Sequence, residues 1–294
     1  MIARTGCRPV YAIGDVHGDA ERLMKVLSAH GLVDVSAGRV CWTQPNVDVV
    51  LMGDVTDAKS RNGDDGDALF EGSFSDLWIL EFVRLAAEEA KKVNSTLVVL
   101  LGNHELMNYR GDFRYASPHH ARNLRSRLEY FQKGAGYRAL TSVFVTTVTY
   151  NGVIYAHAGI PIDPTPTQLK LLDKRVNADL LGLDDVSKDL EDLVSHRDYF
   201  APGDANDAAD TGRRLARILD ARGVKRMVVG HNYTHGSGVV SDYGGRLVFS
   251  DVGISKAFAP NISAACMQIV YDPGDGALRA MQLDGTTRPI PPRR

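Results

Sequence analysis

The sequence has few cysteines, no long hydrophobic run and no surplus of basic charge. Its three cysteines, Cys7, Cys41 and Cys266, lie far apart, which excludes a zinc-binding cysteine spacing and an even-numbered disulfide framework. No apolar run approaches the ~20 residues that span a bilayer, and residues 1–9 lack the apolar core of a secretory signal. We therefore expect a protein of a reducing compartment, the cytoplasm, with no membrane as partner.

Charge and composition further narrow the class of protein to which the chain can belong. The formal net charge at pH 7 is −2, so the chain lacks the basic surplus typical of nucleic-acid-binding proteins, and we expect no nucleic acid as partner. Hydrophobic residues make up 44% of the 294 residues without any biased tract, which is typical of a globular protein with a sizeable core. We expect a single domain over residues 1–287 and a frayed Pro- and Arg-rich tail over residues 288–294. The oligomeric state stays open.

A Gly-Asp-Val-His-Gly motif at residues 14–18 stands between two predicted elements. Residues 10–13 are continuously apolar and predict a buried strand, and residues 19–30 have one apolar face and predict a helix. Asp15 and His17 therefore lie where a strand ends and a helix begins, which is where open α/β sheets bind ligands. One carboxylate and one imidazole at this spacing can hold a divalent metal, although many loops contain such a pair.

The same design follows two further predicted strands. Residues 47–52 lead into Gly-Asp and residues 96–101 lead into Gly-Asn-His-Glu, with a helix predicted over residues 75–94 and capped by Ser75 or Asp76. Alternating strands and helices with continuously apolar strands predict an α/β sheet covered by helices on both faces. The polar residues after these strands should then lie along one edge of the sheet.

The remaining chain predicts further helices and a second sheet. We expect helices over residues 122–132, 168–194 with a break near Gly182, and 210–222, and a strand over residues 225–229. Residues 143–150 and 153–156, joined by Asn151-Gly152, predict a hairpin with a type I′ turn. Short strands at residues 239–240, 247–249, 267–271 and 278–283 predict a second, more antiparallel sheet.

Seven polar residues come directly after apolar strands: Asp15, His17, Asp54, Asn103, His104, His157 and His231. Each of them alone is best explained as a cap or turn residue. Together they favour a shared partner, because a buried strand end is a costly place for polar groups that have none. Carboxylate and amide oxygens mixed with imidazoles suit two divalent ions of Mn, Fe or Zn better than calcium.

These motifs resemble the signature series of one enzyme family. Residues 14–18, 53–57, 102–105, 157–159 and 230–231 are similar, in order, to the motifs of the calcineurin-like metallophosphoesterases. The Gly-Asn-His-Glu motif resembles the phosphoprotein phosphatase branch of that family. The run over residues 102–115 is most like the bacterial-type Shewanella-like protein phosphatases, several of which favour phosphotyrosine.

The resemblance implies a fold and a role for each residue. The implied fold is two packed, mixed central β-sheets flanked by α-helices. Asp15 and His17 would bind the first metal, Asp54 would bridge both metals, and the second metal would be held by Asn103, His157 and His231. His104 would be the general acid, oriented by Asp57, and the substrate phosphate would contact Asn103 and Arg197.

The implied function is a metal-dependent phosphomonoesterase that acts on phosphoproteins at Ser/Thr or Tyr. Two divalent ions, Mn most of all, would clamp the phosphate, and a hydroxide that bridges them would attack phosphorus. Two alternatives stay open: a phosphatase or phosphodiesterase of a small molecule such as a dinucleoside polyphosphate, and a non-catalytic scaffold that binds phosphorylated partners.

The chain departs from the family pattern at two places. The second motif of the family continues Asp-Arg-Gly, whereas here Asp57 is followed by Ala58 and Lys59, so one phosphate-binding arginine is missing. Lys59 or Arg61 could take its place, as a point charge or from a loop that folds back. Arg197, which the resemblance assigns to the phosphate, could instead form a surface salt bridge. The second departure is His235, four residues after His231, which could reach a metal.

Overall fold

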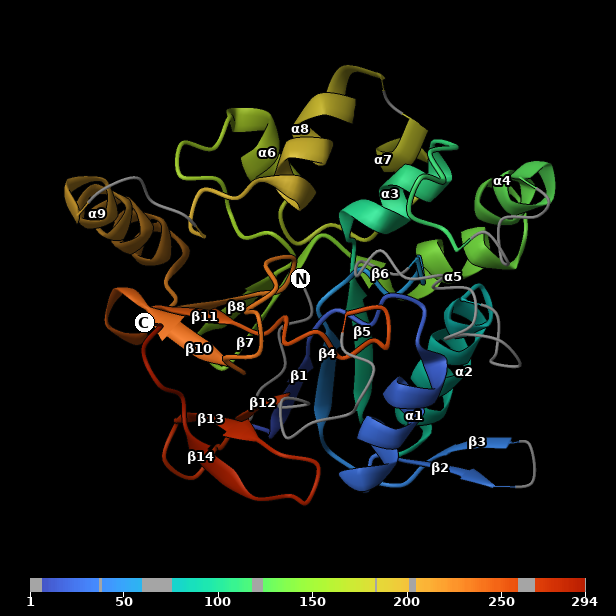
Figure 1. Ribbon diagram of the computed structural model, residues 1–294, viewed down its shortest axis with the longest axis horizontal. Helices are drawn as coiled ribbons and strands as arrows, with labels where there is room; N and C mark the ends of the chain where they lie inside the picture. The colour runs from blue at the N-terminus through green and yellow to red at the C-terminus, as the bar shows by residue number, and fades with distance from the viewer. Residues whose placement is uncertain are drawn as a thin grey trace.

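Two β-sheets occupy the centre of the computed structural model, which describes residues 7–36, 39–59, 76–117, 124–182, 184–200, 205–258 and 268–293 (Figure 1). The larger sheet has the strand order β14-β13-β12-β1-β4-β5-β6, and the smaller has the order β10-β11-β9-β8-β7. The strands of the larger sheet are β1 Val10–Ile13, β4 Asp48–Leu51, β5 Thr96–Leu100, β6 Phe144–Val145, β12 Gln268–Tyr271, β13 Leu278–Met281 and β14 Thr287–Pro289. Those of the smaller sheet are β7 Thr147–Tyr150, β8 Val153–Ala156, β9 Arg226–Val229, β10 Val240–Asp242 and β11 Leu247–Phe249.

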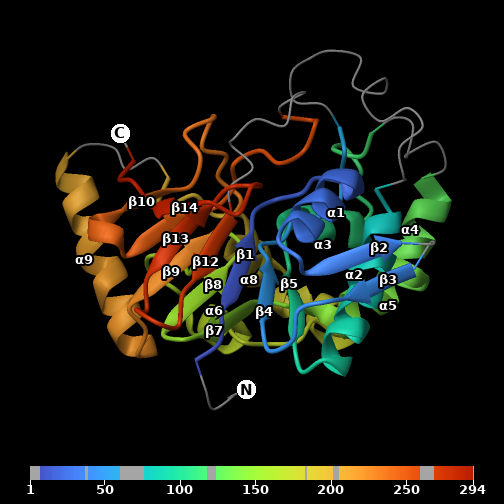
Figure 2. The same cartoon turned by 90° about the horizontal axis from the view of Figure 1, so that it is seen from below.

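Helices cover the outer faces of the two sheets. In both views α1 and α2 lie beside the larger sheet and α9 lies beside the smaller one (Figure 2). The helices are α1 Ala20–Ala29, α2 Trp78–Lys92, α3 Asn103–Tyr109, α4 Leu124–Gln132, α5 Ala135–Val143, α6 Pro166–Leu171, α7 Ala178–Gly182, α8 Asp184–Ser195 and α9 Ala205–Arg222, with a short 3₁₀ turn at Tyr243–Gly245. None of these helices is long and apolar enough to cross a bilayer, as far as the described residues go.

The predicted α/β fold with two packed mixed sheets is confirmed. Strands β1, β4, β5 and β6 run parallel to one another, and so do β8, β9 and β11. Val49 and Val99 of the larger sheet belong to the same buried cluster as Ile154 and Val228 of the smaller one. Every residue of β1, β4 and β5 is buried, because a sheet that is covered on both faces has no polar side. The carboxyl ends of these strands therefore meet at one rim.

The segment that was predicted as one strand over residues 143–150 divides at Thr146. Residues before it extend the larger sheet as β6, beside β5, and residues after it pair with β8 as β7. The Thr146 hydroxyl donates to the Leu171 carbonyl at 2.6 Å, and its backbone N–H donates to the Lys174 carbonyl at 2.9 Å. These bonds hold the chain where it passes from one sheet to the other, and apolar periodicity alone contains no sign of the switch.

Other expectations need correction. The strands predicted over residues 267–271 and 278–283 do not join the second sheet: they extend the larger sheet as β12, antiparallel to β1, and β13, antiparallel to β12. The tail is not frayed where it is described: β14 pairs with β13, and Arg293 forms an ion pair with Asp242 at 2.7 Å. Asp76 does not cap α2, because its carboxylate binds Arg127 instead. The hairpin of β2 Val33–Ser36 and β3 Arg39–Trp42 was not predicted.

Candidate active site

The loops that follow the parallel strands bring the polar residues of the five motifs to one rim. They comprise Asp15 and His17 after β1, Asp54 after β4, Asn103 and His104 at the start of α3, His157 after β8 and His231 after β9. All except Asn103 are buried. This convergence is what the alternation of strands and polar motifs predicts, because parallel strands end on the same side of a sheet.

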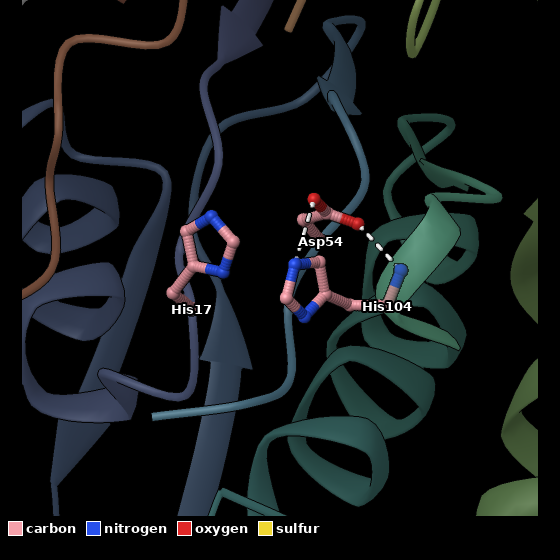
Figure 3. Close-up of side chains that lie close together, drawn as sticks. All are labelled: His17, Asp54 and His104. Carbon is pink, nitrogen blue, oxygen red and sulfur yellow. Dashed lines mark hydrogen bonds and ion pairs between the residues drawn. The ribbon is translucent and has the colours of Figure 1, made fainter. Parts of the chain in front are cut away.

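Asp54 is the residue that two groups of potential metal ligands share. Ligand atoms of His17, Asp54 and His104 lie within 4.8 Å of one another, and so do those of Asp54, His157 and His231. Figure 3 shows the side chains of the first group pointing into a common space. One carboxylate between two clusters is the arrangement that a bridging ligand of two cations requires.

The charge on Asp54 is stabilised by its histidine neighbours. Burial opposes ionisation, but His157 and His104 outweigh it and hold the pKa of Asp54 well below its usual range. Its Oδ2 lies 3.4 Å from His157 Nε2 and 3.8 Å from His104 Nε2, and its Oδ1 accepts the backbone N–H of His104 at 3.0 Å. The carboxylate is thus ionised and fixed, as a metal ligand must be.

The hydrogen bonds of two histidines decide which ring nitrogen faces the site. Nδ1 of His157 donates to the Met52 carbonyl at 2.7 Å, so Nε2 is the ring nitrogen that faces the site, 3.4 Å from Asp54 Oδ2 and 3.2 Å from Asn103 Oδ1. Nε2 of His231 donates to the Ser195 carbonyl at 3.1 Å, which leaves Nδ1 as the candidate ligand atom. Burial lowers the pKa of His231 to about 3, and the neighbouring His157 adds to this, so its imidazole stays neutral and available to a metal.

Asp15 lies at the same rim but outside the two tight groups. Its Oδ2 accepts the backbone N–H of His231 at 2.8 Å, while its buried Oδ1 has no hydrogen-bond partner within the part of the chain that the structure describes. Burial raises the pKa of Asp15 well above its usual range, and nearby Asp251 and Asp54 raise it further. Three buried carboxylates at one place are costly without a cation, so the residues present fit a divalent metal.

Two glycines leave room for these carboxylates, and three of the site residues have a left-handed backbone conformation. A side chain on Gly102 would place its Cβ 2.2 Å from Asp54 Oδ1, and one on Gly230 would come within 2.3 Å of Asp15 Oδ1. His17, Asp54 and His231 all have positive φ angles, of 42°, 46° and 63°. Such left-handed residues are strained unless the surroundings impose them, and they gather at functional sites.

The carboxylate of Glu105 holds the loop that carries Asp54. Its two oxygens accept the backbone N–H groups of Asp54 and Val55 at 3.0 Å, of Thr56 at 3.1 Å and of Gly102 at 3.2 Å. It also accepts the Thr56 hydroxyl at 2.9 Å, and it is fully buried. This explains why the third motif ends in a glutamate, a role that the sequence alone did not suggest.

His104 is paired with Asp57 through a short hydrogen bond. Nδ1 of His104 lies 2.8 Å from Asp57 Oδ2, and both side chains are buried. Oδ1 of Asp57 accepts from Asn108 and from Arg127, each at 2.9 Å. Neither Arg127 nor Asn108 was predicted as a site residue: Arg127 lies outside every motif, and Asn108, although it lies in the run over residues 102–115, had no role assigned to it.

A cavity of about 300 Å³ opens beside the ligand groups. Besides the site residues, it is lined by Arg197, His235, Asp251, and four aromatic side chains, Tyr115, Phe200, Tyr233 and Phe258. Arg197 donates to the Asn232 side chain at 2.7 Å and to the His231 carbonyl at 3.3 Å, so it is held at the cavity wall. Asp251 was missed, although it follows β11 closely, just as the predicted ligands follow their strands.

The structure also shows where the residues lie at which the chain departs from the family pattern. Ala58 is fully buried against Ala257 and Phe258, so position 58 does not open into the cavity. Lys59 donates to the Arg114 carbonyl at 3.1 Å and does not line the cavity, while Arg61 lies outside the described residues. His235 lines the cavity but joins neither ligand group among the residues described.

Residues 8–234 match the model of the calcineurin-like phosphoesterase family. An uncharacterized protein of Schizosaccharomyces pombe is 29% identical over 265 residues, which are 85% of this chain and 74% of that protein. Shewanella-like protein phosphatase 2 of Arabidopsis thaliana is 38% identical over 106 residues, 36% of this chain and only 23% of that protein. The crystal structure of the cold-active protein-tyrosine phosphatase of a psychrophilic Shewanella species superposes with a TM-score of 0.72 at 21% identity, covering 96% of this chain and 80% of that one.

Proposed function

Because the chain belongs to the calcineurin-like phosphoesterases, we propose that it is a phosphomonoesterase that uses two divalent metals and favours aryl phosphates such as phosphotyrosine in proteins. The observation that supports this most is Asp54, which two groups of ligand atoms share, together with His104, a member of the first group that is paired with Asp57. That arrangement joins a place for two cations with a proton donor at the same cavity, which are the parts that hydrolysis of a phosphate ester needs.

Each metal would have its own set of ligands. The first would be held by Asp15, His17 and Asp54, and the second by Asp54, Asn103, His157 and His231. Mn²⁺ suits this mixture of oxygen and imidazole ligands, as do Fe and Zn. Bound in a pair, such ions neutralise phosphate charge and make a water nucleophilic near neutral pH.

The protein residues would bind the substrate and protonate its leaving group. Arg197 donates toward the cavity wall and is the arginine among its described lining residues, so it would hold the phosphate oxygens. His104, with Nδ1 fixed by Asp57, would present Nε2 to the oxygen that leaves. A proton supplied there matters most when the leaving alkoxide is strongly basic.

The aromatic lining supports a preference for aryl esters. The ring centroid of Tyr115 lies 4.9 Å from that of His104, and Phe258 lies 4.8 Å from His17, so the rings border the ligand groups directly. Tyr233 continues this wall at 5.2 Å from Phe258. Aromatic pairs in offset or edge-to-face contact contribute about 0.5–1.5 kcal/mol beyond their buried area, which an aryl group gains and an alkyl chain does not.

The test is a substrate panel on protein purified with Mn²⁺. We expect turnover of p-nitrophenyl phosphate and of a phosphotyrosine peptide, less of a phosphoserine peptide, and little of bis-p-nitrophenyl phosphate or a diadenosine polyphosphate. EDTA should abolish activity and Mn²⁺ should restore it, while Asp54→Asn should lose both bound metal and activity. Faster turnover of the diester or the dinucleotide would contradict the proposal, and so would metal-loaded protein that hydrolyses no substrate.

A further inference from the structure

Arg127 is a buried arginine close to the catalytic pair but outside every motif. It projects from α4, 1% of its side chain is exposed, and its guanidinium lies between the carboxylates of Asp57 and Asp76. Buried arginines are rare unless they are paired, because an uncompensated charge in the interior is very costly. A charge kept here therefore calls for a reason beyond filling space.

The guanidinium uses nearly all of its donors on this one cluster. Nη1 and Nη2 grip the two oxygens of Asp76 at 3.1 and 2.8 Å, and Nη2 also reaches Asp57 Oδ1 at 2.9 Å. Nε donates to Asn108 Oδ1 at 2.7 Å. The amide of Asn108 in turn donates to Asp57 Oδ1 at 2.9 Å and to the His104 carbonyl at 2.8 Å.

These contacts fix the carboxylate of Asp57. Two donors, from Arg127 and Asn108, hold Oδ1, so rotation of the carboxylate would break both bonds. Oδ2 is then the oxygen left for Nδ1 of His104, at 2.8 Å. The imidazole is thereby oriented with Nε2 on the side of the cavity, where its distance to Asp54 Oδ2 is 3.8 Å. Fixed geometry of this kind is what a proton donor needs.

We propose that Arg127 is a positioning residue for the proton transfer: with Asn108, it clamps Asp57 so that His104 faces the leaving group. The inference rests on the proposed phosphomonoesterase function. Arg127 does not line the cavity, so it would act through Asp57 and not on the substrate. Lysine could not replace it fully, because a single ammonium lacks the planar fork that reaches two carboxylates and an amide at once.

The test compares two aryl phosphates that differ in the basicity of the leaving group. Kinetics with p-nitrophenyl phosphate, which needs little protonation, and with phenyl phosphate, which needs more, are measured on Arg127→Met and Arg127→Lys. We expect kcat for phenyl phosphate relative to p-nitrophenyl phosphate to fall at least tenfold in Arg127→Met, since general acid catalysis supplies about 10²–10⁴. Arg127→Lys should fall between this variant and the unmodified chain. The ratio does not depend on how much of a preparation is folded.

Arg125→Met is the matched control on the same helix. Arg125 is 90% exposed and pairs with Glu129 at 3.3 Å, so its removal should leave the ratio unchanged. If Arg127→Met does not fold, the double variant Arg127→Met/Asp76→Asn removes the guanidinium and the charge of its second carboxylate, and keeps an amide oxygen for the Asp57 backbone N–H that Asp76 Oδ2 accepts at 3.2 Å. It should show the same tenfold fall.

A spectroscopic measurement separates this inference from the proposed function. The Nδ1 proton of His104 bound to the buried Asp57 should give a downfield proton resonance that is missing in His104→Asn and lost or shifted in Arg127→Met. An unchanged resonance together with equal losses on both substrates would overturn the positioning role. If the unmodified protein hydrolyses no phosphomonoester, the proposed function fails, and the resonance alone still decides whether Arg127 holds the pair.

Discussion

Replacing Glu105 with glutamine should destabilise the metal-free protein by about 3 kcal/mol. The fully buried carboxylate accepts five hydrogen bonds. Oε1 takes three of them, from the backbone of Val55 and from the backbone and hydroxyl of Thr56. Oε2 takes the other two, from the backbone N–H groups of Asp54 and Gly102. The loop that bears Asp54 is thus attached to the helix that bears His104.

The magnitude follows from the donors that glutamine cannot serve. Its remaining oxygen can stay with the three donors at Oε1, but its NH₂ group then faces the N–H groups of Asp54 and Gly102. Two hydrogen bonds to a charged acceptor are lost, each worth about 1.5–3 kcal/mol. Loss of the charge itself offsets part of this, because burial, with a contribution from Asp54, raises the pKa of Glu105 to about 7. The lower end of the range, about 3 kcal/mol, is therefore the expected value.

The assay is urea unfolding in the presence of EDTA, with the shift in midpoint multiplied by the m-value. Glu129→Gln serves as the control, since Glu129 is 59% exposed and its pair with Arg125 is a surface contact. That control should change the free energy of unfolding by no more than about 0.5 kcal/mol. A loss below about 1 kcal/mol for Glu105→Gln at an unchanged m-value would refute the idea that this carboxylate holds the loop.

Three further predictions concern the site itself. His104→Asn should lower turnover of a phosphoserine peptide far more than turnover of p-nitrophenyl phosphate, because a phenoxide leaves with little help; equal losses in steady-state kinetics would count against an acid role. Arg197→Ala should raise KM for a phosphomonoester several-fold, and an unchanged KM would remove Arg197 from the phosphate site. For His231 the pKa is lowered to about 3 in the fold, so between pH 7 and 5 the unfolded chain takes up a proton that the folded chain does not. Metal-free protein should therefore lose about 2 kcal/mol more stability over that interval than His231→Gln, and parallel unfolding curves for the two would contradict this.

The strands and the meeting of their polar motifs at one rim could be predicted because local pattern and tertiary role agree there. Strands β1, β4 and β5 are short apolar runs that are buried on both faces, and each leads into a polar motif. Sheet membership was harder to predict, because β12 and β13 have the same short apolar character whichever sheet they join. The antiparallel place of β12 beside β1, to which β13 adds, is set by pairing between residues about 260 positions apart in the register Val10 to Tyr271, which no local signal encodes.

The residues of the candidate site likewise fall into those that the sequence could predict and those that it could not. Candidate metal ligands such as Asp54 and His157 could be proposed because each comes just after an apolar strand. Asp251 obeys that rule too, just past β11, and a stricter application of it to the short strands would have found it. Arg127 could not be found this way, since a single arginine on an amphipathic helix is normally a solvated residue. Only the packing of α4 against α3 reveals that its guanidinium is buried on Asp57.

The missing arginine of the second motif is linked to the aromatic wall of the cavity, because Ala58, which stands in its place, packs against Phe258 of that wall. The methyl group of Ala58 fits a closed space, and even an added Cβ on Gly18 would come within 2.7 Å of it. A guanidinium at position 58 would have to displace Ala257 and Phe258, the latter a ring that lines the cavity. Under the proposed function, the phosphate would meet Arg197 as the arginine of the described cavity lining and would depend on the metal ions for most of its charge compensation. The aromatic rings would select the group that is esterified to the phosphate.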